Sequence, residues 1–398
     1  MKQLYENEEL DFLSGKSAGN QNASDEMIND KYIKGEVRII TEQARYPLNT
    51  ILTMVESKAY IMNPEFQRRH RWNTARKSKL IESFIMNVPI PPVFLYEVDY
   101  SVYEVMDGLQ RMTAISQFYK DEFALEELEE WSELNGKRYS QLPEQIRKGI
   151  DRRYLSSIIL LQETAKSARE ANRLKQLVFE RINSGGEKLT PQETRNALFP
   201  GSLNKLCITL ARHPSFCRMW KIPVPCGSEL SKGPVSQELV KNPFFSKMQD
   251  VELVLRFFAY RQIEKWESPS LESFLDEFLR KGNDFDESIL ARYEESFVAT
   301  SDLLFELYGE NAFWLYRQRE GSWIHYERPT KVLYDILMYV ISDLVESRVV
   351  FLEKREQIIQ GTAQLYKDNQ ALLGGRNTNR NDVLKRVGLL TDFFEQFL

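Results

Sequence analysis

The stretch YEVMDGLQRMTAISQF, residues 103–118, predicts a strand that ends at Asp107 and a helix that begins after Gly108. A glycine at such a turn lets the backbone approach a ligand closely, and the free amides of the first helical turn favour an anion. Arg111 lies in that turn, where a cation is unfavourable by roughly 0.3–1 kcal/mol. A phosphate would compensate this cost, because a guanidinium binds it through two hydrogen bonds.

Two interpretations of this turn stay open on the residues alone. In one, Asp107 orients a ribose, a metal ion or an attacking water beside a phosphate held by Arg111. In the other, Asp107 caps the helix, and Arg111 faces solvent or pairs with a surface acid. The pattern D-G-x-x-R is short, so neighbouring motifs have to decide between them.

Size and composition exclude several classes of protein. The 398 residues are enough for two or three domains. A net charge of −5 argues against a protein that coats nucleic acid, so any nucleotide or DNA site is a local patch. The three cysteines form no C-x-x-C pair, which suits a reducing compartment. No apolar run is long enough to span a bilayer, and we expect a cytoplasmic protein without a membrane partner.

Periodicity divides the chain into three parts. Residues 1–35 are polar and predict a flexible tail. Residues 36–164 mix strand-like and helical stretches and predict a compact α/β domain. Beyond it, apolar residues recur at helical spacing, so 165–398 predicts a larger all-helical domain with one proline-rich, non-helical stretch at 213–249. The strands of the α/β domain are expected at 36–40, 93–98, 102–106 and 155–161. The fold class is therefore α+β.

A basic stretch, NPEFQRRHRWNTARKSK, occupies residues 63–79 of the α/β domain. Trp72 lies in its middle, where it can stack on a base while neighbouring cations hold phosphates. A solvated basic face anchored by Trp72 is the alternative. No acid lies between the cations Arg68, Arg69, His70, Arg71, Arg76, Lys77 and Lys79. Contacts with DNA are expected from Arg69, Arg71, Arg76 and Lys77.

A third stretch, FERINSGGEKLTPQETRNALF at 179–199, combines a glycine-rich loop with a helix start. Gly185 and Gly186 end one helix, and Thr190 with Glu193 forms a capping box for the next. This structural account leaves unexplained why so many polar residues share one loop. Such a loop suits a wall that faces phosphate. The residues concerned are Arg181, Asn183, Ser184 and Arg195.

Together the three stretches closely resemble the N-terminal family of the GmrSD type IV restriction endonucleases, whose hallmark is D-G-Q-Q-R. Asp107, Gly108, Gln110 and Arg111 match the hallmark, and Leu109 replaces its first glutamine. The resemblance extends to three later stretches, at 250–260, 311–337 and 377–387. It implies a ParB/sulfiredoxin-like core that binds, and is expected to hydrolyse, a nucleoside triphosphate in defence against phage DNA. The substitution at Leu109 puts hydrolysis in more doubt than binding.

The resemblance also implies the site residues. Asp107, Gln110 and Arg111 are expected to be catalytic, with Mg²⁺ accompanying the nucleotide and no metal site of the protein's own. The expected nucleotide ligands are Gln67, Arg68, Trp72, Lys79, Gly108, Arg111, Thr113, Arg181, Asn183, Ser184, Gly186 and Arg195.

The sequence lacks one motif that related DNA-cutting proteins often carry, and this bears on the expected partners. Its three histidines are scattered, without a His-Asn-His nuclease motif. Cutting would then belong to a separate nuclease subunit or to the ParB-like core itself. The resemblance and the basic stretch predict DNA as a partner, and an oligomer stays possible. A ParB-like DNA-binding or DNA-nicking protein, or a non-catalytic scaffold that recruits a nuclease, remains the alternative.

Overall fold

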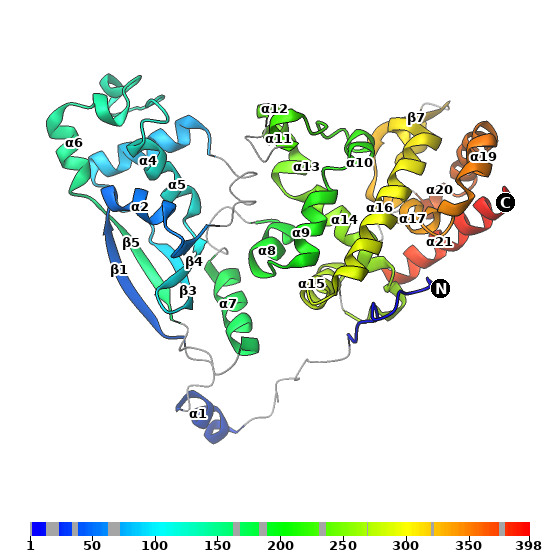
Figure 1. The fold of residues 1–398 in the computed structure, drawn as a ribbon, viewed down its shortest axis with the longest axis horizontal. Helices are drawn as coiled ribbons and strands as arrows, with labels where there is room; N and C mark the ends of the chain where they lie inside the picture. The colour runs from blue at the N-terminus through cyan, green and yellow to red at the C-terminus, as the bar shows by residue number, and fades with distance from the viewer. Residues whose placement is uncertain are drawn as a thin grey trace. The chain divides into compact units, whose positions relative to one another are not determined.

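A computed structural model describes residues 2–12, 24–33, 39–62, 72–161, 168–182, 189–230, 236–268, 270–319, 322–373 and 379–398. The chain forms two compact units (Figure 1). The sheet unit comprises residues 17–189, and the helical unit comprises residues 1–16 together with 190–398. The sheet unit is therefore an insertion in the sequence of the helical unit. None of the described helices is long and apolar enough to cross a membrane.

The sheet unit contains a mixed five-stranded sheet among its described residues, in the order β1-β5-β3-β4-β2. β3 pairs antiparallel with β4 and parallel with β5, while β1 pairs antiparallel with β5 and the short β2 parallel with β4. The strands predicted at 93–98, 102–106 and 155–161 are confirmed. Of the strand predicted at 36–40, residues 36–38 lie outside the described residues, and the first described strand begins at residue 41. The strands are β1 (Thr41–Pro47), β2 (Tyr60–Ile61), β3 (Val93–Asp99), β4 (Val102–Asp107) and β5 (Tyr154–Leu160).

Helices cover both faces of this sheet (Figure 1). Val105 of β4 lies in a core that it shares with Ile81 of α4 and Ile115 of α5. Glu104, whose side chain alternates to the opposite face, forms a 2.5 Å ion pair with Lys175 of α7. The helices of this unit are α1 (Asp25–Ile33), α2 (Ile51–Glu56), α4 (Thr74–Met86), α5 (Leu109–Tyr119), α6 (Glu144–Asp151) and α7 (Ala168–Ile182).

The helical unit is built around one large apolar core of aliphatic and aromatic side chains. A buried ion pair crosses that core: Arg256 donates to Asp335, with Nε and Oδ1 2.9 Å apart. The helices are α8 (Pro191–Leu198), α9 (Ser202–Leu210), α10 (Pro214–Met219), α11 (Gly227–Leu230), α12 (Gln237–Lys241), α13 (Pro243–Ser246), α14 (Gln249–Tyr260), α15 (Leu271–Gly282), α16 (Glu287–Tyr308), α17 (Lys331–Ile341), α18 (Arg348–Glu353), α19 (Arg355–Asp368), α20 (Gln370–Leu373) and α21 (Arg380–Glu395).

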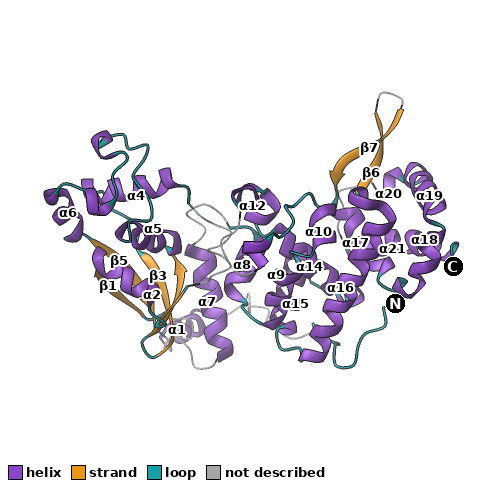
Figure 2. Cartoon of the chain, turned by 45° about the horizontal axis from the view of Figure 1, so that its top comes forward, coloured by secondary structure: helices purple, strands orange, loops and turns teal. Residues whose placement is uncertain are grey.

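The helical unit is not entirely helical, which corrects the expectation for 165–398. Strands β6 (Trp314–Arg319) and β7 (Ser322–Pro329) form an antiparallel hairpin. Figure 2 shows this hairpin projecting from the helices of its unit. The segment is rich in aromatic residues, which favour strands, and its two strands are separated by only two residues.

The stretch 213–249 was expected to lack helices, and this was wrong. Short helices α10 to α13 occupy much of it. Pro214 and Pro243 stand at the first positions of α10 and α13, where the missing amide hydrogen costs nothing. Prolines here begin helices instead of excluding them.

The expected flexible tail is also corrected over residues 2–12, which pack against the helical unit. Lys2 is buried, and its ammonium group lies 2.7 Å from Asp343. Burial lowers the pKa of Lys2 to about 8 against the opposing effect of Asp343. Glu8 is fully buried, and its carboxylate accepts hydrogen bonds from Arg261 at 2.6 Å and from Tyr293 at 2.9 Å. These polar residues satisfy one another inside the protein, and composition alone could not show that.

The expected boundary at 164 also differs from the observed division. α7 was placed in the helical part, yet the compact sheet unit reaches residue 189 and includes it. The Lys175–Glu104 ion pair attaches α7 to the sheet. The glycine-rich loop after α7 therefore joins the two units.

The amino-terminal segment offers a test with two adjacent carboxylates. Glu8→Gln should lower the free energy of unfolding by roughly 3–5 kcal/mol, because it leaves Arg261 buried without a counter-charge. Glu9 pairs with Lys265, but its side chain is 72% exposed, so Glu9→Gln should change stability little. Urea unfolding of both variants measures the difference. Equal stability of the two would show that the segment does not dock.

Candidate functional site

The turn between β4 and α5 requires a glycine. Gly108 has φ 95° and ψ 6°, in the left-handed region that other residues avoid. A Cβ built on Gly108 would also lie 2.3 Å from Cγ1 of Val93, the buried first residue of β3. Both the backbone angle and the space therefore exclude a side chain. The chain can enter α5 directly from the end of β4 only because residue 108 is glycine.

Arg111 is held by groups of the protein. Its Nη2 donates to Oδ2 of Asp107 at 2.7 Å, and its Nη1 donates to the carbonyl oxygens of Pro91 and Pro92. The side chain is only 12% exposed. Burial lowers the pKa of the Arg111 guanidinium, and the adjacent Asp107 carboxylate opposes that shift. The cation at the helix start is thus compensated in the folded protein itself.

Asp107 does not have the capping role that the sequence left open. Gly108 is the N-cap residue of α5, and no side chain caps this end. The Asp107 carboxylate, 39% exposed, pairs with Arg111 one helical turn ahead. The structure therefore shows the ion pair of the second interpretation, with the partly exposed Asp107 as the acid, but not the helix cap by Asp107.

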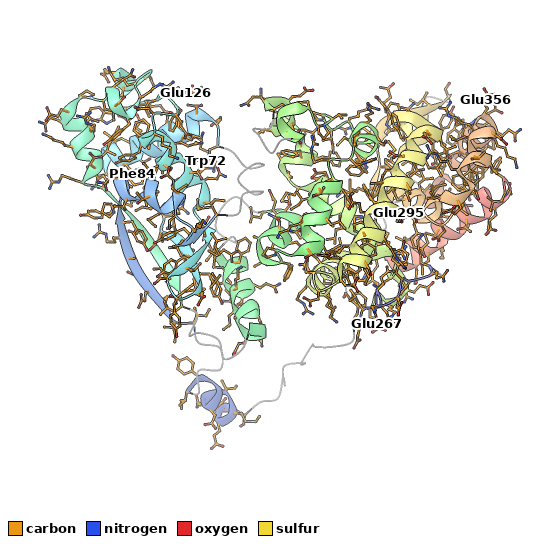
Figure 3. The ribbon with its side chains drawn as sticks, in the orientation of Figure 1. Trp72, Phe84, Glu126, Glu267, Glu295 and Glu356 are labelled. Atoms are coloured by element: carbon orange, nitrogen blue, oxygen red, sulfur yellow. The ribbon has the colours of Figure 1, made fainter. Side chains whose placement is uncertain are left out.

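Trp72 connects the basic stretch to the start of α5. Its backbone amide donates to Oε1 of Gln110 at 3.3 Å, and its ring packs against the core of the sheet unit. The guanidinium of Arg76, on the first turns of α4, lies 4.7 Å from the centre of the Trp72 ring. Figure 3 labels Trp72 just before α4. A ring, an amide side chain and an exposed cation thus meet at the amino end of α5.

The polar side chains of α5 continue this region along one face of the helix. Gln110, Thr113 and Gln117 follow the i, i+3, i+7 spacing that places residues on a common face. Within the described part of the chain, Oγ1 of Thr113 and Oε1 of Gln117 are buried without a hydrogen-bond partner. Buried groups of this kind normally bind a partner, so this face has unused hydrogen-bonding capacity.

Leu109, which replaces a glutamine of the family hallmark, packs in the core. It is 6% exposed and belongs to the apolar cluster beneath the sheet. By helical spacing, position 109 lies one turn before Thr113 on neighbouring parts of the helix surface, and its side chain is buried in the core. The leucine contributes packing at the first position of α5.

The other predicted cations of the sheet unit are dispersed. Lys79 is exposed and pairs with Glu129 at 2.8 Å, and Lys77 lies 5.4 Å from the ring centre of Phe123. Arg181 is exposed on the last turn of α7. Seven further predicted site residues lie outside the described ranges: Gln67, Arg68, Arg69, Arg71, Asn183, Ser184 and Gly186.

Arg195, predicted to bind nucleotide, has a structural role in the helical unit. It is 1% exposed, and its Nε lies 2.6 Å from Oδ1 of Asp276. Its terminal nitrogens donate to Gln192, to Glu252 and to the carbonyl of Glu272. Every nitrogen of the guanidinium is occupied, so we remove Arg195 from the candidate site. A buried network that ties α8 to α14 and α15 accounts for it.

The described residues fit a Mg²⁺ ion only as a companion of a nucleotide. No group of three His, Cys, Asp or Glu side chains that could hold a metal occurs in the described ranges. Asp107 uses Oδ2 for Arg111 and has a second carboxylate oxygen. Mg²⁺ is commonly held by one or two carboxylates together with substrate phosphates. Asp107 would hold such an ion, which would neutralise phosphate charge.

Two features of this region were not among the predictions from the sequence. The carbonyl partners of Arg111 lie about twenty residues earlier, at Pro91 and Pro92, and no local pattern indicates them. Gln117 was not selected, although its spacing from Gln110 and Thr113 places it on the same helical face. The spacing of Asp107 and Arg111, four residues apart, was a usable signal for their ion pair.

The contacts of Arg111 predict a loss of stability. Arg111→Gln should lower the free energy of unfolding by about 1–3 kcal/mol, because Asp107 and the two proline carbonyls lose a charged donor. Lys120→Gln is the control at the other end of α5. Lys120 pairs with Glu56 on the surface, where such pairs contribute at most about 1 kcal/mol. Thermal melting without ligand measures both, and an unchanged Arg111→Gln variant would refute the structural role.

Among known proteins, one family model matches the region of the chain that contains the candidate site. No curated protein and no solved structure matches the chain. A family model does match residues 48–200, which include β3, β4, α5 and the basic stretch. The matched segment ends two residues before α9 begins, and the resemblance noted at 250–260, 311–337 and 377–387 stays a prediction. The match identifies residues 48–200 as a GmrSD restriction endonuclease, N-terminal domain.

Proposed function

We propose that the sheet unit binds a nucleoside triphosphate at the amino end of α5, as part of a restriction system that acts against phage DNA. The family supports the restriction context. Nucleotide binding is inferred from one observation: Gln110, Trp72 and Arg76 contact one another in sequence beside the helix start at Gly108. It combines a helix start, which favours phosphate, with a ring and a cation that suit a base or a phosphate chain.

Each part of a nucleotide has a candidate partner. The first amides of α5, beside the glycine turn, would bind phosphate oxygens. The Trp72 ring and the exposed guanidinium of Arg76 would contact the base or the outer phosphates. Thr113, whose hydroxyl is buried without a described partner, would supply a further hydrogen bond.

The role proposed for Arg111 is positioning. With its guanidinium bonded to Asp107 and to the Pro91 and Pro92 carbonyls, it fixes the glycine turn against the start of β3. For Arg111 to bind phosphate, a nucleotide would have to replace the Asp107 carboxylate. That exchange would free Asp107 to hold Mg²⁺ or to orient a water beside Gln110. Hydrolysis is proposed to depend on this exchange.

DNA is the second proposed partner. The family is one of restriction endonucleases, and α4 exposes Arg76 and Lys79 beyond Trp72. These cations favour a polyanion, and binding through them would weaken with salt as phosphate contacts are lost. Because no nuclease motif was found in the sequence, a separate nuclease subunit is proposed to make the cut.

A thermal-shift panel with ATP, GTP, CTP and UTP, each with Mg²⁺, tests nucleotide binding on the full chain. At least one nucleotide should raise the melting temperature, because a ligand stabilises the folded state by RT ln(1 + [L]/Kd). Arg76→Gln and Trp72→Leu should each remove most of that rise. Absence of any shift with all four nucleotides would refute the proposal.

Arg45→Gln is the matched control for these variants. The guanidinium carbon of Arg45 lies 5.1 Å from the ring centre of Tyr154. Both residues belong to the sheet unit, where β1 pairs with β5. The variant reproduces the loss of a cation over an aromatic ring without touching α5. The nucleotide shift should survive in Arg45→Gln. Loss of the shift in this variant as well would mean that the effect reports general destabilisation.

A further inference from the structure

We propose that the β6–β7 hairpin of the helical unit enters a groove of duplex DNA. The hairpin lies outside the segment matched by the family model and contains none of the residues assigned to the nucleotide. The inference rests on DNA as a partner in the proposed function, but not on nucleotide binding.

The shape of the hairpin fits a DNA groove. Its strands have six and eight residues, so they extend roughly 20–26 Å at about 3.3 Å per residue. Figure 2 shows the outer part of the pair projecting beyond the helices of its unit, while the base of β6 packs against the helical core. A two-stranded ribbon, with its strands about 5 Å apart, is narrow enough for the major groove, which is about 12 Å wide.

The exposed side chains of β7 combine apolar, aromatic and basic groups. Ile324 is 43% exposed and Tyr326 is 39% exposed, and Arg328 is exposed two residues later. An aliphatic group can contact a thymine methyl, a tyrosine can reach phosphate or a base edge, and an arginine can bind phosphate or guanine.

Lysines flank the base of the hairpin from the helical body. Lys221 lies 4.5 Å from the ring centre of Trp314, and Lys367 of α19 lies 5.2 Å from that of Tyr316. Tyr316 in turn stacks on Trp323 at 6.0 Å, which stiffens the ribbon. Both lysines remain at least partly exposed. Their positions would place positive charge near the phosphates on either side of a groove.

Two observations favour DNA over a protein partner. Lysine is depleted at the centre of protein–protein interfaces, whereas it is frequent where a protein meets phosphates. Glu327 is an exposed carboxylate on β7, and two cations are close to it: Lys221 donates to its backbone carbonyl at 3.2 Å, and Arg328 follows it in the sequence. The hairpin therefore suits a polyanion better than an apolar protein partner.

Fluorescence anisotropy of the full chain with a labelled duplex of roughly two helical turns tests the inference. Wild-type protein should bind with an affinity that falls as salt rises, and Arg328→Gln should reduce the slope of log K against log[salt] by about 1. Tyr326→Ser should weaken binding at every salt concentration without changing the slope. Arg328→Lys should restore the slope, since it keeps the charge.

Arg218→Gln is the matched control. Arg218 is an exposed arginine beside an aromatic ring, 5.4 Å from the ring centre of Phe305, on the helical body of the same unit. Its DNA binding should equal that of wild type. Wild-type affinity in both hairpin variants, or no salt-dependent binding by the wild type, would overturn the inference. So would hairpin variants that change the sedimentation coefficient but not the affinity for DNA, since they would indicate a protein contact.

The nucleotide shift separates this inference from the proposed function. All hairpin variants should keep the melting-temperature rise of wild type with the preferred nucleotide. If wild type shows no nucleotide shift while Arg328→Gln still loses DNA affinity, nucleotide binding is refuted and the hairpin inference stands.

Discussion

The close approach of Gly108 to Val93 is the constraint on which the sheet unit depends. A Cβ at position 108 would lie 2.3 Å from the Val93 side chain, and the backbone angle there is left-handed. Because this turn is tight, α5 starts directly above the end of β4 and beside the start of β3. Arg111 then reaches Asp107 on one side and the carbonyls of Pro91 and Pro92 on the other. The Arg111 guanidinium thus joins the end of β4, through an ion pair, to the residues just before β3, through two hydrogen bonds.

Buried charge plays a comparable part in the helical unit. Arg256 with Asp335, Arg261 with Glu8, and Arg195 with Asp276 each join segments distant in the sequence. Removing one partner from such a pair costs more than the pair itself contributes, because the remaining ion stays buried. The pairs therefore specify which helices adjoin at least as much as they add stability. This explains why arginines that look like ligands in the sequence can have structural roles.

The sequence predicted the sheet unit well because its signals are local. The strand at 102–106, the glycine turn and the helix that follows need only neighbouring residues, and the Asn73 cap of α4 is equally local. The partners of Arg111 and Arg195 lie too far along the chain to be predicted in that way. The β6–β7 hairpin was missed for a different reason: it is a short segment between two long stretches of clear helical spacing. Residues 2–12 were misjudged because composition does not reveal whether polar groups satisfy one another.

The course of the chain sets a requirement on the helical unit. Residues 2–12 dock on this unit through Lys2 and Glu8, and the chain returns to it at Thr190, so the sheet unit is an insertion between two parts of one core. Bringing those two parts together across an insertion costs loop-closure entropy. The buried pair of Glu8 with Arg261 and the pair of Lys2 with Asp343 offset part of that cost.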